Sequence, residues 1–480
     1  MGYAQKAVVI GAGISGLACA FRLKQLGIQC LVLEAQDRAG GVIATIRRNG
    51  FLFETGPQCP RFPAPLWRLV QDLNLESEVV AGDKEAKRYI FRNGRMHSAP
   101  FSPGALLTTG LLGLSAKVRL LTEAFRSSHP PLQEESLADF VHRKFGTEVL
   151  DNLVDPVIST IFFGDPHRMG MESAFPALVQ WERNQGSIVR GAIRASKIKR
   201  EAAPRNAILA TLTSNGKRGT WHVTKALPQL GSFRSGMGRL PERLAEVLGE
   251  QIRYGMGITL VAPRREGDDS GDKCWQIGLS NGDRILAEHV VLAVPAYAAA
   301  QLLASRAPQL ASRLESIEYA PVCTVSSAYN RSQVANTLDG FGFMVPRREG
   351  LHTICTFWNS SLFPGRGPEG QVVMTSFAGP ATPGEGQPET PEQCTRQVQE
   401  ENARVLGITG EPVDRVFWKG QRALPQYNVG HARRIAEVCE MLPTLPNLYL
   451  AGNFLTGRSV GDCVETADRV AEALRSHVSV

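Results

Sequence analysis

The first forty residues constrain the fold more than any other part of the chain. An apolar strand over residues 7–10 runs into a Gly-x-Gly-x-x-Gly turn over residues 11–16. A helical pattern follows, and a second apolar strand, residues 30–33, ends directly before Glu34. This order of strand, glycine turn, helix, strand and acid is typical of a dinucleotide-binding βαβ unit. We therefore predict a Rossmann-type domain with a nucleotide cofactor at its first turn.

Each glycine of the turn has its own task in such a unit. Gly11 lets the chain turn tightly, Gly13 lets the backbone approach a pyrophosphate, and Gly16 lets the helix pack closely on the strand. The N-terminus of the helix then directs N–H groups and a partial positive charge at the phosphates, while Glu34 accepts hydrogen bonds from a ribose. The cofactor contacts predicted for this unit are Gly11, Gly13, Ile14, Ser15, Gly16 and Glu34.

Length and composition narrow the remaining possibilities. A chain of 480 residues is too long for one compact core, so we expect two or three domains. The net charge of +7 suits an anionic ligand or membrane surface, but no run of five or six basic residues predicts a nucleic-acid partner. The nine cysteines are scattered without a Cys-x-x-Cys pair, so we predict no metal site, no disulfide framework and a reducing compartment. No signal-peptide pattern is visible, and we expect a cytoplasmic location.

One apolar segment raises the question of membrane contact. Residues 103–114 are mostly apolar, and Lys117 and Arg119 follow them. A membrane-spanning helix needs roughly 20 apolar residues, so this segment does not span. Two interpretations stay open. The segment lies in a membrane interface with its basic residues toward the lipid headgroups, or it is a loop and helix packed on the protein core.

A second strand, glycine-rich turn and helix appears near the end of the sequence. An apolar strand ends at Gly452, and a helical pattern runs over residues 464–474. A flavin dinucleotide is long enough to use two such turns, the first for its pyrophosphate and the second for its ribityl chain and flavin. We expect Asp462 to hydrogen-bond the ribityl chain or pyrophosphate, and the N–H groups of Cys463 and Val464 to stabilise negative charge on the flavin. The contacts predicted for this unit are Gly452, Asn453, Asp462, Cys463 and Val464, with no covalent link to the flavin.

Periodicity and turn residues predict the elements between these two units. An Asn-Gly pair at 93–94 with apolar residues on both sides predicts a β-hairpin. Helical spacing dominates residues 115–200, and alternating apolar segments over 320–380 predict a mixed or antiparallel sheet. Glycine- and proline-rich stretches predict surface loops at 204–220 and 379–391.

Several segments together resemble the protoporphyrinogen oxidases and their bacterial coproporphyrinogen-oxidising relatives, in the amine oxidase superfamily. The resemblance covers nearly the full length. Residues 38–41 and 54–57 resemble flavin-binding segments of the whole superfamily, whereas residues 161–165, 341–342 and 425–431 are more specific to this family. The further FAD contacts that the resemblance implies are Arg38, Gly40, Gly41, Gly56 and Pro57.

The resemblance implies an α/β fold of three domains. They are a discontinuous Rossmann-type FAD-binding domain (1–87, 233–305 and 420–480), a mixed-sheet α+β substrate-binding domain (88–97, 206–232 and 306–419) and a helical domain with a capacity for membrane association (98–205).

The implied activity is that of an oxygen-dependent protoporphyrinogen oxidase in haem biosynthesis. Non-covalent FAD would take electrons two at a time, so conversion of protoporphyrinogen IX to protoporphyrin IX needs three rounds. The six electrons would pass to dioxygen and form hydrogen peroxide. Oxidation of coproporphyrinogen III to coproporphyrin III, a flavin amine oxidase and a flavin-holding scaffold without turnover remain as alternatives. The implied setting is peripheral contact with the inner face of the cell membrane, with a homodimer and transfer of product to a ferrochelatase-type enzyme.

Residue by residue, the resemblance implies a substrate pocket. Arg88 would hold a propionate, which suits the bidentate geometry of a guanidinium and a carboxylate. Phe341, Gly342 and Met344 would line the pocket, with Gly342 leaving room for the ring system, and Phe377 would pack on a pyrrole ring. Because Arg88 is the one basic anchor identified, we favour protoporphyrinogen over the tetrapropionate substrate.

Two positions depart from the family pattern. Gln58 and Cys59 stand where a Gly-Pro-Asn-Ser sequence usually continues, and Gly379-Pro380 replaces a Gly-Gly pair. We identify no catalytic side chain beyond the flavin, and we expect His431, the nearest candidate for a base, to be structural.

Overall fold

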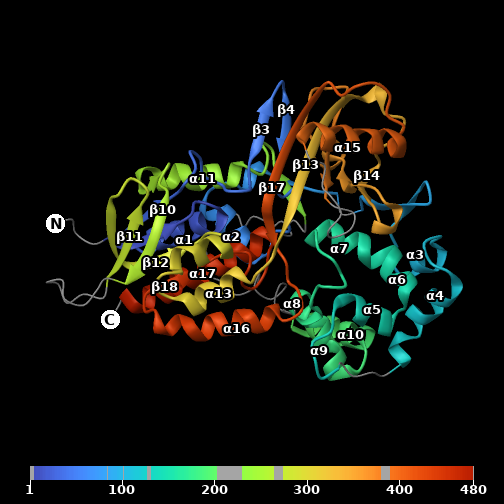
Figure 1. Ribbon diagram of the computed structural model, residues 1–480. Coiled ribbons are helices and arrows are strands. Elements are labelled where there is room, and N and C mark those ends of the chain that lie inside the picture. The colour runs from blue at the N-terminus through green and yellow to red at the C-terminus, as the bar shows by residue number, and fades with distance from the viewer. Residues whose placement is uncertain are drawn as a thin grey trace, which may run out of the picture.

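The computed structural model describes residues 5–83, 85–100, 102–126, 131–202, 230–263, 274–379 and 390–478. They form three regions: a sheet with helices on both faces, a second sheet covered by one long helix, and a group of short helices (Figure 1). The loop predicted at 204–220 lies outside the described residues, as do residues 380–389 of the loop predicted at 379–391.

The first region is built on a seven-stranded sheet with a parallel centre. β1 (Gln5–Ile10) lies between β2 (Cys30–Leu33) and β12 (Arg284–Leu292) and is parallel to both. Val8 and Val9 of β1 are completely buried on opposite faces, as expected of a strand covered on both sides. The remaining strands of this sheet are β9 (Ile252–Arg253), β10 (Ile258–Pro263), β11 (Trp275–Leu279) and β18 (Leu448–Leu450).

Helices cover both faces of this sheet. On one face α1 (Ile14–Gln25) packs against α17 (Val460–Val478), and Arg22 Nε bonds Asp468 Oδ1 at 2.7 Å between them. The predicted second unit is confirmed, because β18 pairs with β12 and leads into α17. The same face also carries α2 (Ala64–Asp72) and α11 (Arg239–Leu248), and the other face carries α12 (Ala296–Leu303), α13 (Pro308–Glu315) and α16 (His431–Met441).

The second region is a mixed seven-stranded sheet, as the alternating segments predict. Its order is β17-β13-β16-β15-β14-β6-β7, antiparallel except between β14 and β6. The predicted hairpin is confirmed: Asn93 and Gly94 both have positive φ, 49° and 72°, as a two-residue type I′ turn requires. α15 (Pro391–Leu406) covers one face of this sheet (Figure 1). The strands are β6 (Lys87–Arg92), β7 (Arg95–Ser98), β13 (Tyr319–Asn330), β14 (Gly340–Met344), β15 (Thr353–Phe357), β16 (Gln371–Ala378) and β17 (Asp414–Pro425).

Two small sheets and a short helix connect these regions. β3 (Thr45–Arg48) pairs with β4 (Phe51–Glu54), and β5 (Val79–Ala81) pairs with β8 (Gly231–Phe233). α14 (Asn359–Leu362) follows β15.

The third region is helical, as predicted for residues 115–200. Its apolar core includes Phe140, Ile158, Phe162 and Met171. The helices are α3 (Pro103–Thr108), α4 (Leu114–Leu121), α5 (Leu137–Lys144), α6 (Thr147–Val149), α7 (Asp155–Phe162), α8 (Met171–Ala174), α9 (Pro176–Gln185) and α10 (Ile188–Ala202).

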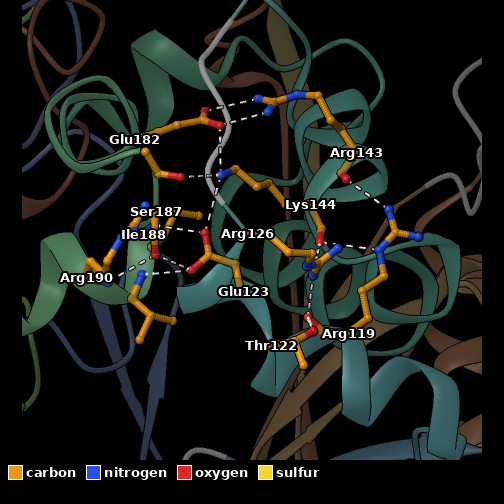
Figure 2. A network of polar contacts seen from close by, with 12 residues as sticks. Arg119, Thr122, Glu123, Arg126, Arg143, Lys144, Glu182, Ser187, Ile188 and Arg190 are labelled. Atoms are coloured by element: carbon orange, nitrogen blue, oxygen red, sulfur yellow. Dashed lines mark hydrogen bonds and ion pairs between the residues drawn. The ribbon is translucent and has the colours of Figure 1, made fainter.

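A network of buried charges holds the helical region together (Figure 2). Glu123 caps α10, because its carboxylate accepts hydrogen bonds from Ser187 Oγ at 2.6 Å and from the N–H groups of residues 188 and 189 at 3.0 and 3.1 Å. Lys144 Nζ joins Glu123 at 3.3 Å to Glu182 at 2.8 Å. Arg143 completes the network with two hydrogen bonds to Glu182, of 2.7 and 3.0 Å. The network therefore links α5, α9 and α10.

One part of the apolar segment at 103–114 packs on the protein core, and another part is exposed to solvent. Leu111 and Leu112 are buried, but Leu107 and Leu114 are 55% and 79% exposed. Arg119 Nη2 donates to the carbonyl oxygens of His142 and Arg143 at the end of α5, as the interpretation of a segment packed on the protein would have it. Among the described residues, no helix is long and apolar enough to cross a membrane.

Candidate active site

The glycine turn before α1 encloses an open space beside Gly13. Gly11 has φ +102°, and a Cβ at that position would lie 2.6 Å from Ala293 O. A Cβ on Gly16 would overlap Gly11 O, but a Cβ on Gly13 would meet no atom within 4 Å. The first turn of α1 has no side-chain cap, so its N–H groups are directed at this space. The turn therefore fits a pyrophosphate.

Glu34 is held in place at the end of β2. Its Oε2 accepts from Ala12 N at 2.6 Å, and its Oε1 accepts from Gln36 N at 2.9 Å. The carboxylate is thus fixed beside the glycine turn, where the sequence predicts a ribose.

The segment from Arg38 to Pro57 lies against the same turn. Gly40 N donates to Ala12 O at 2.8 Å, and Arg38 Nη2 donates to Gly41 O at 2.7 Å. A Cβ on Gly56 would overlap Val42 O, so only glycine fits beside that backbone. Residues 38–41 and 56–57 therefore lie close to the first turn.

The start of α17 differs from the prediction. Ser459 and Asp462 form a capping pair, in which Ser459 N donates to Asp462 Oδ2 at 2.9 Å and Asp462 N donates to Ser459 Oγ at 3.1 Å. The helix consequently begins at Val460, and the N–H of Cys463 donates to Ser459 O at 3.0 Å. The expectation that this N–H is free for a flavin is wrong, because Ser459 caps the helix four residues earlier.

The side chain of Cys463 nevertheless forms a contact between the two glycine units. Its side chain is buried against Ser15, and burial raises the pKa of its thiol to about 11. A Cβ on Gly461 would overlap Pro63, so the start of α17 also lies close to the segment after Gly56. The predicted cofactor segments therefore lie next to one another, and the uncapped N–H groups of α1 and the open space beside Gly13 fit a dinucleotide.

Aromatic rings on the second sheet form a continuous series beside Arg88. The Arg88 guanidinium carbon lies 4.6 Å above the Phe341 ring, and the Phe341 and Phe357 centroids are 6.0 Å apart. Phe377 follows at 5.7 Å from Phe357, and Phe163 of the helical region lies 5.2 Å from Phe377. We name these four rings, Phe341, Phe357, Phe377 and Phe163, the aromatic wall.

The structure brings together the predicted pocket residues and adds two more. Met344 packs against Ile90 on one side and lies in the same apolar cluster as Phe377. Phe357 and Phe163 were not among the pocket residues predicted from the sequence. Phe357 shares a strand face with Cys355, so the period of two was its signal.

Gly342 has a different role from the one expected. Its φ is +133°, and a Cβ there would overlap Thr356 O on β15. The close approach of two strands therefore requires glycine at this position, whereas the prediction gave the glycine a role in leaving room for a ligand.

The guanidinium of Arg88 is partly removed from water. Its side chain is half-buried, and desolvation lowers its pKa, with Arg61 acting in the same direction and Cys59 opposing it. Binding of a carboxylate would restore the favourable environment of the charge.

His431 is structural, in agreement with the sequence analysis. Its ring is stacked on Tyr427 with centroids 4.3 Å apart, and its Nε2 lies 2.9 Å from Phe454 O. Burial and the neighbouring Arg434 lower its pKa to about 4, against a smaller opposing effect of the bond to Phe454. A neutral imidazole in this place supports the backbone of the flavin segment.

A separate cavity of about 350 Å³ adjoins Phe163. Its charged side chains are already paired: Arg168 with Glu318 at 2.7 Å and Arg347 with Asp165 at 3.1 Å. Phe163 of the aromatic wall forms part of its lining.

Comparison with known proteins settles the family. A model of flavin-containing amine oxidoreductases matches residues 14–475. The chain belongs to this family. It is a flavin-dependent oxidoreductase, and FAD is its cofactor.

The similar curated proteins cover nearly the whole chain. Protoporphyrinogen oxidase 1 from the chloroplast of Arabidopsis thaliana is 30% identical over 98% of this chain and 88% of its own length. The chloroplast protoporphyrinogen oxidase of Nicotiana tabacum is 29% identical, over 98% and 86%. The coproporphyrinogen III oxidase of Bacillus subtilis is 27% identical, over 95% of both chains.

Solved structures show the same fold. A crystal structure from Exiguobacterium sp. 255-15 superposes with a TM-score of 0.79, at 24% identity and over 99% of both chains. Reduced UDP-galactopyranose mutase superposes with a TM-score of 0.70, at 15% identity and over 99% of this chain and 94% of its own.

Proposed function

We propose that the chain oxidises protoporphyrinogen IX to protoporphyrin IX, with dioxygen as electron acceptor and hydrogen peroxide as second product. The observation that carries the proposal is the aromatic wall with Arg88 at one end, in a chain similar over nearly its full length to protoporphyrinogen oxidases. Six electrons leave the substrate, so the reaction runs in three rounds of two. FAD, when bound, would supply the two-electron redox chemistry, with dioxygen as the final acceptor.

The chain's own residues bind and orient the substrate. Arg88 pairs with a propionate, whose negative charge offsets the desolvation of the guanidinium. Phe341, Phe357 and Phe377 offer apolar faces to the macrocycle and exclude water from it. The predicted FAD contacts of both glycine units, apart from the N–H of Cys463, and those of the segments 38–41 and 56–57 hold the cofactor. The predicted division into three domains belongs to the same proposal.

An aerobic assay of the purified flavoprotein tests this function. Protoporphyrinogen IX and coproporphyrinogen III are supplied separately, and porphyrin fluorescence and peroxide are followed together. Faster turnover of the first supports the proposal. Preference for the second supports the alternative that the Bacillus subtilis relative suggests. Absence of turnover with both, but peroxide from an amine, would favour an amine oxidase.

We also propose that the helical region contacts an anionic membrane, such as the inner face of a cell membrane. Leu114, Val118, Leu121 and Phe125 recur at helical spacing along α4 and the turn after it, and all are at least 49% exposed. Such a stripe, with Lys117 beside it, suits insertion among lipid headgroups.

Vesicle sedimentation tests membrane contact. The protein should bind vesicles that contain phosphatidylglycerol more strongly than neutral ones, and a Leu114→Ser/Phe125→Ser variant should lose most of this binding. Val413→Ser, which alters an apolar residue in another region that is 49% exposed, serves as control. Equal binding of all three proteins contradicts the proposal.

Homodimerisation and transfer of product to a ferrochelatase-type enzyme complete the proposed setting. Light scattering of the purified protein tests the dimer. Transfer is tested in a coupled assay of this protein with a ferrochelatase-type enzyme, to which an excess of a porphyrin-binding protein is added. Product that passes directly between the two enzymes should not be trapped by the porphyrin-binding protein.

A further inference from the structure

Arg458 is a largely buried arginine in the loop between β18 and α17. Its guanidinium carbon lies 3.0 Å from the centroid of the Phe162 ring. Its Nη1 is buried and has no hydrogen-bond partner, and no carboxylate of the described chain lies within 4 Å of its guanidinium. Burial lowers its pKa to about 10, although the nearby Tyr427 and Asp462 oppose the shift.

A buried charge with an unbonded donor destabilises the protein unless an anionic partner binds to it. Buried charged groups are normally paired, and a guanidinium donor without an acceptor loses the free energy of its hydration. Other arginines of this chain are paired internally, such as Arg143 with Glu182 and Arg347 with Asp165. Arg366 and Arg434 also have buried donors without an acceptor, but their Nη2 atoms make hydrogen bonds, whereas the contact found for the Arg458 guanidinium is with an aromatic ring. The guanidinium of Arg458 therefore suits an anionic group that is not part of the chain.

The position of Arg458 relates it to the aromatic wall. Phe162, under its guanidinium, is followed directly by Phe163, whose ring contacts Phe377. Arg88 lies over Phe341 at the opposite end of the same series of rings. Arg458 therefore contacts the residue that precedes Phe163 in the chain, on the helical side of the aromatic wall, whereas Arg88 lies at its Phe341 end.

We propose that Arg458 is a second carboxylate anchor, which binds a propionate on the edge of the macrocycle remote from Arg88. This inference rests on the proposed porphyrinogen oxidation and extends its substrate range. Protoporphyrinogen IX carries its two propionates on one edge and vinyl groups on the other. Coproporphyrinogen III carries propionates on both edges, so it can engage both arginines. The chain therefore accepts tetrapropionate porphyrinogens in addition to protoporphyrinogen IX, and Arg458 sets how well it uses them relative to protoporphyrinogen IX.

A different role for Arg458 would give a different result. The residue lies two positions before the start of α17, so its charge could act on the flavin instead of the substrate. An effect on the flavin would change the oxidation of every substrate by the same factor. An anchor for one propionate changes the ratio between substrates.

The test uses the FAD-loaded protein and the variants Arg458→Met and Arg458→Lys. The kcat/KM values for coproporphyrinogen III and protoporphyrinogen IX are measured for each, with flavin content from absorbance. We expect Arg458→Met to lower the ratio of the coproporphyrinogen to the protoporphyrinogen value by about tenfold or more, since a hydrogen bond to a charged group contributes about 1.5–3 kcal/mol. Arg458→Lys should retain part of the ratio. An equal loss with both substrates, or a constant ratio, overturns the proposal.

Equilibrium binding separates this inference from the proposed function. Coproporphyrin III, and its tetramethyl ester as the uncharged control, are titrated against each holoprotein by fluorescence quenching. Weaker binding of the acid but not of the ester by Arg458→Met supports the anchor, even if no porphyrinogen is oxidised. Unaltered binding of the acid overturns the anchor while turnover by the unmodified protein leaves the proposed function standing. If Arg458→Met does not fold, Arg458→Gln takes its place in both measurements.

Discussion

Two regions of the molecule bury charged side chains and treat them in opposite ways. In the helical region, Glu123, Lys144 and Glu182 are bound to one another and to the backbone of α10 (Figure 2). In the first region, Arg458 keeps a donor without an acceptor where it meets Phe162 of the helical region, and Gly13 faces open space beside an uncapped helix. The first arrangement is complete without a ligand and the second is not. Substitutions in the first should therefore cost stability, and substitutions in the second should cost ligand affinity.

Lys144→Met should give the largest effect. It removes the cation between two buried carboxylates, and breaking one partner of a buried ion pair costs about 3–5 kcal/mol. Urea unfolding followed by circular dichroism measures the loss. Arg183→Met, which breaks a half-exposed pair with Glu172 in the same region, should cost no more than about 1 kcal/mol. Equal losses for the two variants would remove the distinction between the regions.

Arg88→Ala should raise KM for the porphyrinogen about tenfold to a hundredfold, because a hydrogen bond to a charged group contributes about 1.5–3 kcal/mol. Flavin content and the urea midpoint should stay close to those of the unmodified protein. Lys87→Ala is the matched control, since Lys87 is the neighbour of Arg88 on β6 and its side chain pairs with Asp339. An unaltered KM in Arg88→Ala would exclude Arg88 as the propionate anchor.

Gly13→Ala should weaken FAD without unfolding the chain. Gly13 has φ −70°, which alanine accepts, and the added Cβ meets no protein atom. It would instead occupy space that the pyrophosphate needs, and overpacking typically costs about 1–3 kcal/mol, or roughly tenfold to a hundredfold in affinity. Dialysis followed by flavin fluorescence gives the dissociation constant. Gly16→Ala should differ by unfolding the domain, because its Cβ would overlap Gly11 O. Full FAD affinity in Gly13→Ala would show that the open space is not the pyrophosphate site.

The pH dependence of stability should show a smaller effect in the helical region. Burial raises the pKa of Glu123, but the bonds from Ser187, Ile188, Val189 and Lys144 outweigh it and hold the pKa below the ordinary 4.5. A carboxylate with a lowered pKa stabilises the fold above its ordinary value, and this contribution disappears as the pH falls through the folded-state pKa. The difference in urea midpoint between the unmodified protein and Glu123→Gln should therefore shrink as the pH falls below about 4.5. A constant difference would contradict the role of the ionised carboxylate.

Local signals allowed most of the fold to be predicted. The glycine turn, the ribose acid and the Asn-Gly hairpin each depend on residues a few positions apart, and the structure contains all three elements. The Ser459–Asp462 capping pair was equally local, and recognising it would have placed the start of α17 correctly.

Contacts between regions could not be predicted in the same way. Phe163 meets Phe377 only because α7 packs on the second sheet, and Arg458 meets Phe162 only because the first region packs on the third. The reason for Gly342 likewise lies in the pairing of β14 with β15. Such neighbours follow from strand register and packing, which no short motif encodes.

The packing of α1 against α17 has a consequence for how the chain is made. Arg22 of α1 bonds Asp468, 446 positions later, and Cys463 closes against Ser15. During synthesis the glycine turn emerges first, but the helix that completes its core is translated last among these elements. The nascent chain must therefore keep an unfinished apolar surface on α1 until α17 arrives, and contacts this distant in sequence are slow to form. Binding of FAD consequently follows translation. A shortage of FAD would therefore affect the completed polypeptide and not the nascent chain on the ribosome.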